Sequence, residues 1–225
     1  AFDSDRQEVV DGASANGISR ILNPGINIDS SHAAVGIADT YSGVFAAVGV
    51  HPNDAKSWRL TSLSSIRKLA KHPKIRAIGE IGLDYYRDYS PHELQKEIFR
   101  AQLDLAAELS LPVVIHNRDA DVDMLPILGA WHSELVSSRN PLAERPGVLH
   151  SFSGDLESAK RALSWNFFLG ITGPVTFKKA DTLREIVREI PVESLLIETD
   201  APFLTPHPHR GKRNEPSHVR FIAGK

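Results

Sequence analysis

Short apolar runs alternate with amphipathic segments along the chain, and this alternation predicts the order strand, helix, strand, helix. Seven strands are expected, at residues 18–22, 44–50, 75–81, 113–116, 148–152, 167–171 and 194–200. Helices are expected at residues 2–15, 30–41, 63–70, 90–109, 122–135, 156–163 and 183–190, and again from about Pro216. The apolar runs are continuous rather than alternating, which is typical of parallel strands that helices cover on both faces.

This pattern predicts an α/β fold of the TIM (β/α)8 type, as one domain spanning residues 1–225. The sequence opens with a helix, so we expect the first strand of the barrel, and a segment beyond Lys225, to lie outside the residues given. The barrel wall is then expected to be open between strands 18–22 and 194–200. An open doubly wound sheet is the alternative, but the sequence contains no glycine-rich GxGxxG turn that would support it.

The helix that begins near Ser90 has the clearest start signal in the chain. Ser90 is followed by Pro91 and Glu93, which predicts a capping box with Ser90 as the N-cap and proline at the first helical position.

Composition excludes several classes of protein. The chain has 225 residues, a formal net charge of −2 and no cysteine. A global cationic field for gripping nucleic acid is therefore absent, and disulfides and thiolate metal ligands are ruled out. No run is long and apolar enough to predict a membrane span. The absence of cysteine suits a reducing compartment, and we expect a cytoplasmic location.

Four predicted strands end in side chains that bind metals, namely Glu80, His116, His150 and Asp200. In a parallel barrel the C-terminal ends of the strands face one shared mouth, so these side chains are expected to converge there. Each has an ordinary explanation alone, such as a solvated carboxylate or a packed imidazole. Together they predict a site for Zn, Mn or Fe, and the carboxylates also admit Mg.

Six segments carry a resemblance to a known family. They are GVHP (49–52), IGEIGLD (78–84), VIH (114–116), HSFSG (150–154), ETDAP (198–202) and RNEP (213–216). In this order, and over nearly the whole chain, they resemble the TatD family of metal-dependent DNases, which are amidohydrolase-like TIM barrels. The resemblance implies a pair of divalent ions (Mg, Mn or Zn) and a DNA substrate, with single strands or 3′ ends preferred.

The resemblance also implies roles for the four strand-end residues. Glu80 would bridge the two metals, and His116 and His150 would hold one of them. Asp200 would hold the other metal and act as the catalytic group that accepts a proton from the attacking water.

One departure from the family pattern affects the metal site. The family carries a His-x-His pair at the end of its first strand, whereas the His-x-His of this sequence, residues 207–209, follows the last strand. The family's segment would lie just before Ala1. Without it the first metal loses two ligands, while Glu80, His116 and His150 could still hold one ion.

Substrate contacts are expected from four further residues: His51, Arg118, Arg213 and Asn214. His51 ends a strand and, by the resemblance, lines the mouth; it can equally be a turn residue before a proline. Arg118 could meet a phosphate or be a salt-bridged residue at the rim. Arg213 and Asn214 fall within the family's RNEP motif, in a basic loop that could otherwise be merely solvated.

Two other features receive weaker assignments. Glu198 is expected to be structural and deeper in the barrel than Asp200, although both should point to the same side of their strand. Tyr85 and Tyr86 follow the Glu80 strand and could stack a base or sugar, although packing in the core is the commoner role of such aromatics.

Taken together, the sequence predicts a metal-dependent hydrolase, namely a deoxyribonuclease of the exonuclease type. One alternative is a deacylase or amidohydrolase on the same barrel site, because such ligands also serve C–N and ester hydrolysis. Phosphate-binding capacity at Arg118 and in the 210–213 loop separates these two. A truncated, non-catalytic scaffold that binds a partner is the third hypothesis.

Overall fold

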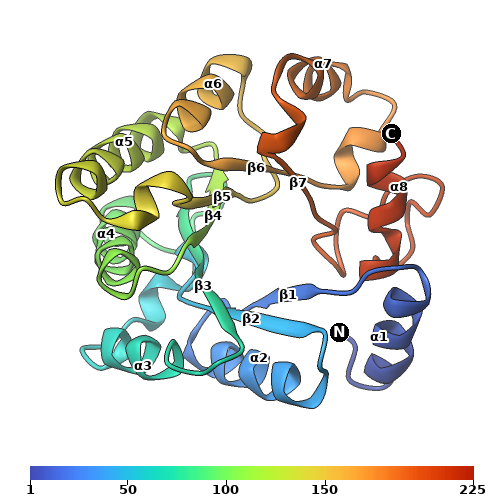
Figure 1. Ribbon diagram of the computed structural model, residues 1–225, viewed down its shortest axis with the longest axis horizontal. Coiled ribbons are helices and arrows are strands. Elements are labelled where there is room, and N and C mark those ends of the chain that lie inside the picture. Colours follow the sequence, from blue (N-terminus) through green and yellow to red (C-terminus); the bar gives the residue numbers. More distant parts are fainter.

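The computed structural model describes residues 1–225 and contains one parallel sheet of seven strands, which neighbour one another in sequence order. The strands are β1 (Ile21–Pro24), β2 (Val44–Val48), β3 (Ile75–Asp84), β4 (Val113–Arg118), β5 (Gly147–Leu149), β6 (Phe168–Ile171) and β7 (Leu195–Ile197). Figure 1 shows the sheet curled inside a ring of helices. The predicted α/β class, the seven strands and their parallel order are confirmed.

The outer layer consists of α1 (Arg6–Ala15), α2 (Ile28–Thr40), α3 (Ser62–Leu69), α4 (His92–Leu109), α5 (Asp121–Ser137), α6 (Leu156–Ser164), α7 (Asp181–Glu189) and α8 (Val219–Ala223). Each of α2 to α7 follows one strand and returns the chain to the start of the next, as parallel pairing requires. None of the helices combines the length and the hydrophobicity that a bilayer crossing requires.

Apolar side chains fill both sides of the sheet. On β2, Val44, Ala46 and Val48 belong to the large core cluster that the helices cover, whereas Ala47 belongs to a small cluster inside the barrel. This alternation is the two-residue period of a strand. Burial on both faces explains why the sequence shows continuous apolar runs.

The two edges of the sheet are β1 and β7, which do not pair with each other. Figure 1 shows them as the two ends of the curled sheet, with α8 and α1 near this side of the ring. Leu22 on β1 and both Leu196 and Ile197 on β7 are exposed large apolar side chains. The open wall expected between these strands is therefore present in the described residues, and its edges carry unpaired backbone groups.

Several boundaries differ from those predicted. β3 continues past residue 81 to Asp84, whereas β5 and β7 end before His150 and Asp200, which lie in the segments that follow. The predicted capping box at α4 is wrong. The helix begins at His92 with Pro91 as its N-cap, and no side chain caps it.

The serine expected as the cap has another role. The buried Ser90 hydroxyl accepts a hydrogen bond from the N–H of Lys56 at 3.3 Å and donates one to the carbonyl of Asn53 at 3.2 Å. It therefore fastens the loop before α4 to the short 3₁₀ segment η1 (Pro52–Ser57).

Candidate active site

The four strand-end residues gather at the C-terminal end of the sheet as two imidazole–carboxylate pairs. His116 Nδ1 lies 3.0 Å from Glu80 Oε1, and His150 Nε2 lies 3.4 Å from Asp200 Oδ1. The two pairs are close enough that the charges of Glu80 and His150 influence each other. Four separate βα units thus contribute to one site, as barrel enzymes require.

A local irregularity in β3 positions Glu80. The register between β3 and β4 shifts between Ile78 and Ile81, which is a bulge of the kind that redirects a side chain. Gly82, two residues further on, has a φ of +142°, and a Cβ there would come within 1.9 Å of the carbonyl oxygen of His116. The glycine therefore allows β3 to approach β4 closely where the site is built.

His51 joins Glu80 and His116 in a cluster whose potential ligand atoms all lie within 4.8 Å of one another. Its Nε2 is 3.5 Å from Glu80 Oε1, because its Nδ1 accepts a hydrogen bond from the N–H of Asn53 at 3.1 Å and so fixes the ring. The His51 and His116 rings meet edge to face, with centroids 4.3 Å apart. His51, expected to contact substrate, thus lies within the group that could hold a metal.

Asp84 is a member of the site that the sequence analysis did not assign. Its Oδ2 lies 3.0 Å from His116 Nε2, and its carboxylate also accepts hydrogen bonds from the N–H of Arg87 at 2.9 Å and from Asn53 Nδ2 at 3.2 Å. Glu80 and Asp84 stand four residues apart on one strand, and the IGEIGLD segment contains both. An even spacing along a strand was the available signal, but the predicted end of β3 at residue 81 hid it.

Glu198 has a more specific role than the structural one predicted for it. Its Oε2 lies 2.8 Å from His150 Nδ1 and accepts the N–H of Ser151 at 3.0 Å. Gly170 on β6 makes room for this carboxylate, because a Cβ there would come within 2.2 Å of Oε2. Glu198 and Asp200 therefore hold the two nitrogens of one imidazole ring, and Glu198 sets the ring's orientation.

The charges at the site support one another. Burial alone would lower the pKa values of His116 and His150, but the carboxylates beside them outweigh it, so that the pKa of His116 is raised and that of His150 is raised well above its ordinary value. Burial would likewise raise the pKa of Glu80, but hydrogen bonds from His116 and His51 hold it well below its usual range. In Asp84 the same competition brings the pKa to about 2. The carboxylates therefore favour the protonated form of the two imidazoles, and the imidazoles in turn favour the ionised form of the carboxylates.

This donor set fits a divalent cation. Imidazole nitrogens and carboxylate oxygens are the ligands that Zn²⁺ and Mn²⁺ accept, and an added cation would take the place of the imidazole protons. The amide oxygen of Asn53, whose Nδ2 donates to Asp84, is buried without any hydrogen-bond partner. Polar groups that the protein leaves unpaired in this way occur at functional sites.

The other predicted substrate residues divide into two cases. Arg118 ends β4, two residues beyond His116, and its guanidinium stacks on the ring of Tyr86 at 3.8 Å. Arg213, by contrast, is paired with Asp5 and lies over the ring of Phe2.

Asn214 is completely buried behind the site. Its Nδ2 donates to the carbonyls of Thr199 and Phe203, each at 2.6 Å, and its Oδ1 accepts the N–H of Glu215 at 2.9 Å. Both N–H hydrogens of the Asn214 amide therefore bind the loop that carries Asp200. Both side chains are therefore engaged within the protein, and their contact with substrate stays a prediction.

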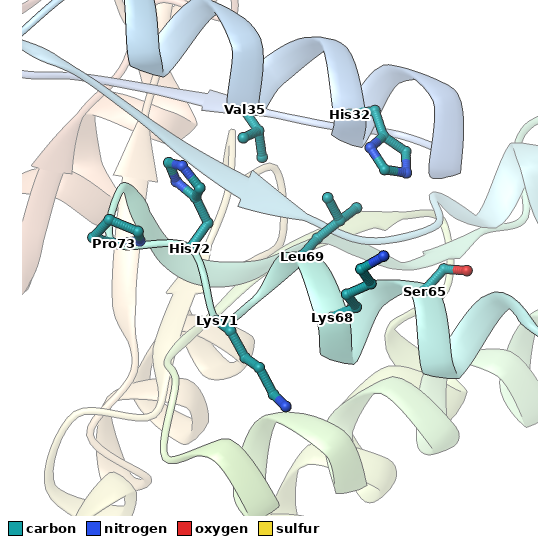
Figure 2. Close-up of a pocket in the computed structure, with 8 residues that line it drawn as sticks. All are labelled: His32, Val35, Ser65, Lys68, Leu69, Lys71, His72 and Pro73. Atoms are coloured by element: carbon teal, nitrogen blue, oxygen red, sulfur yellow. The ribbon is translucent and has the colours of Figure 1, made fainter.

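A surface groove lies elsewhere. It has a volume of about 460 Å³ and is lined by residues of α2, of α3 and of the segment that leads into β3, as Figure 2 shows with His32, Val35, Lys68 and His72. None of the site residues lines it. The chemistry of the strand ends, rather than the size of a hollow, identifies the candidate active site.

The whole chain, residues 1–225, matches the family described as TatD related DNase. The chain belongs to this family. It is 45% identical over 222 residues to a protein of Bacillus subtilis named as an uncharacterized metal-dependent hydrolase, YabD, covering 99% of this chain and 84% of that protein. It is 39% identical over 227 residues to the Escherichia coli K12 protein named 3′-5′ ssDNA/RNA exonuclease TatD, covering 98% of this chain and 84% of that one.

Solved structures of the TatD family share the fold. The Escherichia coli TatD homolog YjjV has a TM-score of 0.89 at 29% identity, over 99% of this chain and 83% of its own. A TatD family hydrolase from Entamoeba histolytica has a TM-score of 0.81 at 27% identity, over 97% of this chain and 80% of its own. An organophosphorus hydrolase variant from Deinococcus radiodurans matches at a TM-score of 0.55 and 13% identity, over 86% and 65% of the two chains, which shows the shared fold alone.

Proposed function

We propose that this chain is a metal-dependent phosphodiesterase that removes nucleotides from the ends of DNA, single strands and 3′ ends above all. The observation that carries the proposal is the convergence of two imidazole–carboxylate pairs at the C-terminal strand ends, beside the unpaired guanidinium of Arg118. Membership of the TatD family and the exonuclease name of its relatives support the same substrate class. The lack of cysteine remains our reason for proposing a cytoplasmic location.

The ligands would come from both pairs. Glu80 belongs to the group it forms with His51 and His116, and its charge also acts on His150, so it is the group best placed to contact more than one ion. We therefore propose a two-ion site of Mg, Mn or Zn, with His116 and His150 as further ligands. When bound, such ions lower the pKa of a water molecule and neutralise charge on the oxygens of a phosphodiester.

Asp200 is proposed to accept the proton of the attacking water. Its side chain is 32% exposed. The other carboxylates of the site are less exposed, with 1% for Asp84, 12% for Glu80 and 19% for Glu198. Its one polar contact within the site is the 3.4 Å approach to His150. A carboxylate that is open to solvent and lightly bound can receive a proton, whereas Asp84 and Glu198 are already occupied in holding imidazole rings.

Two substitutions test this division of roles. Asp200→Asn keeps the shape and one oxygen donor but removes the base, so we expect kcat to fall by about 10²-fold or more while at least one ion stays bound. His150→Ala should deplete the bound metal together with activity. The measurements are kcat on a labelled single-stranded oligonucleotide with excess Mg²⁺ or Mn²⁺, and metal content by elemental analysis.

Either result can contradict the proposal. A near-normal kcat in Asp200→Asn would show that another group is the base, and full metal content in His150→Ala would show that the ligand set is different. Hydrolysis of amide or carboxylic ester substrates without any hydrolysis of DNA would replace the phosphodiesterase by the deacylase alternative.

A further inference from the structure

Two tyrosines that follow the site residue Asp84 are exposed without a packing role. Tyr86 is 58% exposed and Tyr89 is 56% exposed. Their neighbour Tyr85 behaves differently, because it stacks on His92 with centroids 3.7 Å apart and donates its hydroxyl to Asp123. Core packing therefore accounts for Tyr85 but not for the other two.

Arg118 lies over the ring of Tyr86 and has no other side-chain partner. Its guanidinium carbon is 3.8 Å from the centroid of the Tyr86 ring, and its side chain forms no hydrogen bond or salt bridge with any other group of the protein. Arg213 and Arg67, by contrast, are paired with the carboxylates of Asp5 and Glu108. Because the N–H groups of a guanidinium lie in its plane, stacking fixes the group while leaving its donors free.

Arg87 is a second arginine near these exposed rings. Its guanidinium carbon lies 5.4 Å from the Tyr86 ring and 5.9 Å from the Tyr89 ring, and its side chain likewise has no carboxylate partner. Two free cations thus alternate with two exposed aromatic rings. The name aromatic platform is used below for these four residues, Tyr86, Arg87, Tyr89 and Arg118.

The platform is attached directly to the candidate active site. The backbone N–H of Arg87 donates to Asp84 Oδ1 at 2.9 Å, and the other oxygen of that carboxylate contacts His116. On the neighbouring strand β4, Arg118 lies two residues after His116, and its backbone carbonyl accepts a hydrogen bond from the N–H of Tyr85 at 2.8 Å. A ligand bound on the platform would therefore be held at a fixed position relative to the residues that carry out the chemistry.

We propose that the aromatic platform binds an unpaired nucleic-acid strand, with bases stacked on the tyrosines and phosphates held by the two arginines. This inference rests on the proposed nuclease function and adds to it the reason for single-strand selectivity. Every base has a π-face, so tyrosine stacking is indifferent to sequence. In a duplex those faces are covered by neighbouring bases, so the platform can grip a strand only where the bases are free.

Binding of a fluorescent single-stranded oligonucleotide, followed by anisotropy with a chelator present to prevent turnover, tests the platform apart from catalysis. Tyr86→Ala should weaken binding by roughly 5- to 150-fold, the range for losing one stacked base. Tyr86→Phe keeps the ring and should bind as the wild type does. Replacing a single base by an abasic site, at one position of the strand after another, should at one position erase the difference between wild type and Tyr86→Ala.

The arginines are tested by salt dependence. Arg118→Gln should make the slope of log K against log salt shallower by about 0.7, the value for one phosphate contact on a single strand. Arg145→Gln is the matched control, because Arg145 is exposed and precedes the opposite, N-terminal end of β5. It should leave both binding and slope unchanged.

The outcomes separate this inference from the proposed function. If the wild type hydrolyses single strands and Tyr86→Ala binds and cleaves them normally, the platform is wrong while the nuclease stands. If the metal-loaded protein hydrolyses no nucleic acid yet Tyr86→Ala loses strand binding, the platform stands as a binding site without the nuclease. If the wild type binds single strands no better than duplex, the platform is refuted.

Discussion

Replacing Glu198 by glutamine tests the idea that a carboxylate outside the proposed ligand set controls the metal site. Glu198 Oε2 contacts His150 Nδ1 at 2.8 Å, which is the distance of a charge-assisted hydrogen bond. Glu198→Gln keeps the size of the side chain and an oxygen that can still accept the N–H of Ser151. It removes the negative charge that holds the ring and makes its other nitrogen a better ligand.

The size of the effect follows from this geometry. Loss of such an orienting carboxylate typically lowers metal affinity or activity by about 10- to 100-fold, which corresponds to roughly 1.4–2.7 kcal/mol. We expect the Mn²⁺ affinity of Glu198→Gln to fall within that range. The fold should persist, because shape and hydrogen-bonding capacity are retained.

Calorimetric titration of the metal-free protein with Mn²⁺ measures this prediction, together with kcat/KM on a single-stranded oligonucleotide. Glu185→Gln, an exposed position on α7, is the matched control and should behave as the wild type does. If Glu198→Gln binds Mn²⁺ with unchanged affinity and keeps its kcat/KM, then the contact with His150 does not serve the metal site and the reasoning is wrong.

Two further predictions concern the stability of the fold around the site. Asn214→Ala removes a buried side chain that donates to two backbone carbonyls of the Asp200 loop, so the free energy of unfolding in urea should fall by about 1–3 kcal/mol. In the metal-free protein, His116 and His150 have pKa values above that of a free imidazole, so their protonated forms stabilise the folded state. This stability is fully present below pH 6.5 and is lost as the pH rises through the pKa values of the folded state. The urea midpoint of unfolding should therefore fall as the pH rises above 6.5.

Each has a clear contrary outcome. A loss below about 0.5 kcal/mol in Asn214→Ala is the range of an ordinary surface substitution and would show that the loop does not depend on this side chain. A urea midpoint that rises from pH 6.5 to 9 in the presence of chelator would contradict the raised pKa values of the two imidazoles. Added Mn²⁺ should stabilise the protein increasingly over the same range, because the metal competes with protons for the rings.

The sequence predicted the parts of the molecule that follow from a repeating local pattern. Continuous apolar runs between amphipathic segments indicated seven parallel strands, and the polar residues that end those runs indicated which end of the sheet carries the chemistry. Glu80, His116, His150 and Asp200 could be placed together because parallel strands bring their ends to one side. No knowledge of individual contacts was needed for that step.

Side-chain contacts between segments that are distant in the sequence could not be predicted from local patterns. Nothing local to Arg213 indicates that its partner is Asp5, which is 208 residues away. The role of Glu198 depends on the space left by Gly170 on a neighbouring strand. Ser90 had the local signature of a helix cap, yet tertiary contacts turned its hydroxyl elsewhere. Local patterns specify elements, whereas side-chain pairing depends on how those elements pack.

The most direct test of the account is the fate of a 5′-labelled single-stranded DNA oligonucleotide incubated with the purified protein and Mn²⁺. We predict a ladder of products shortened from the 3′ end, abolished by chelator and reduced by at least about 10²-fold in Glu80→Gln, which removes the central charge of the site. An intact oligonucleotide with the metal-loaded wild type, or an undiminished ladder in Glu80→Gln, would contradict the assignment of a metal-dependent nuclease to this site.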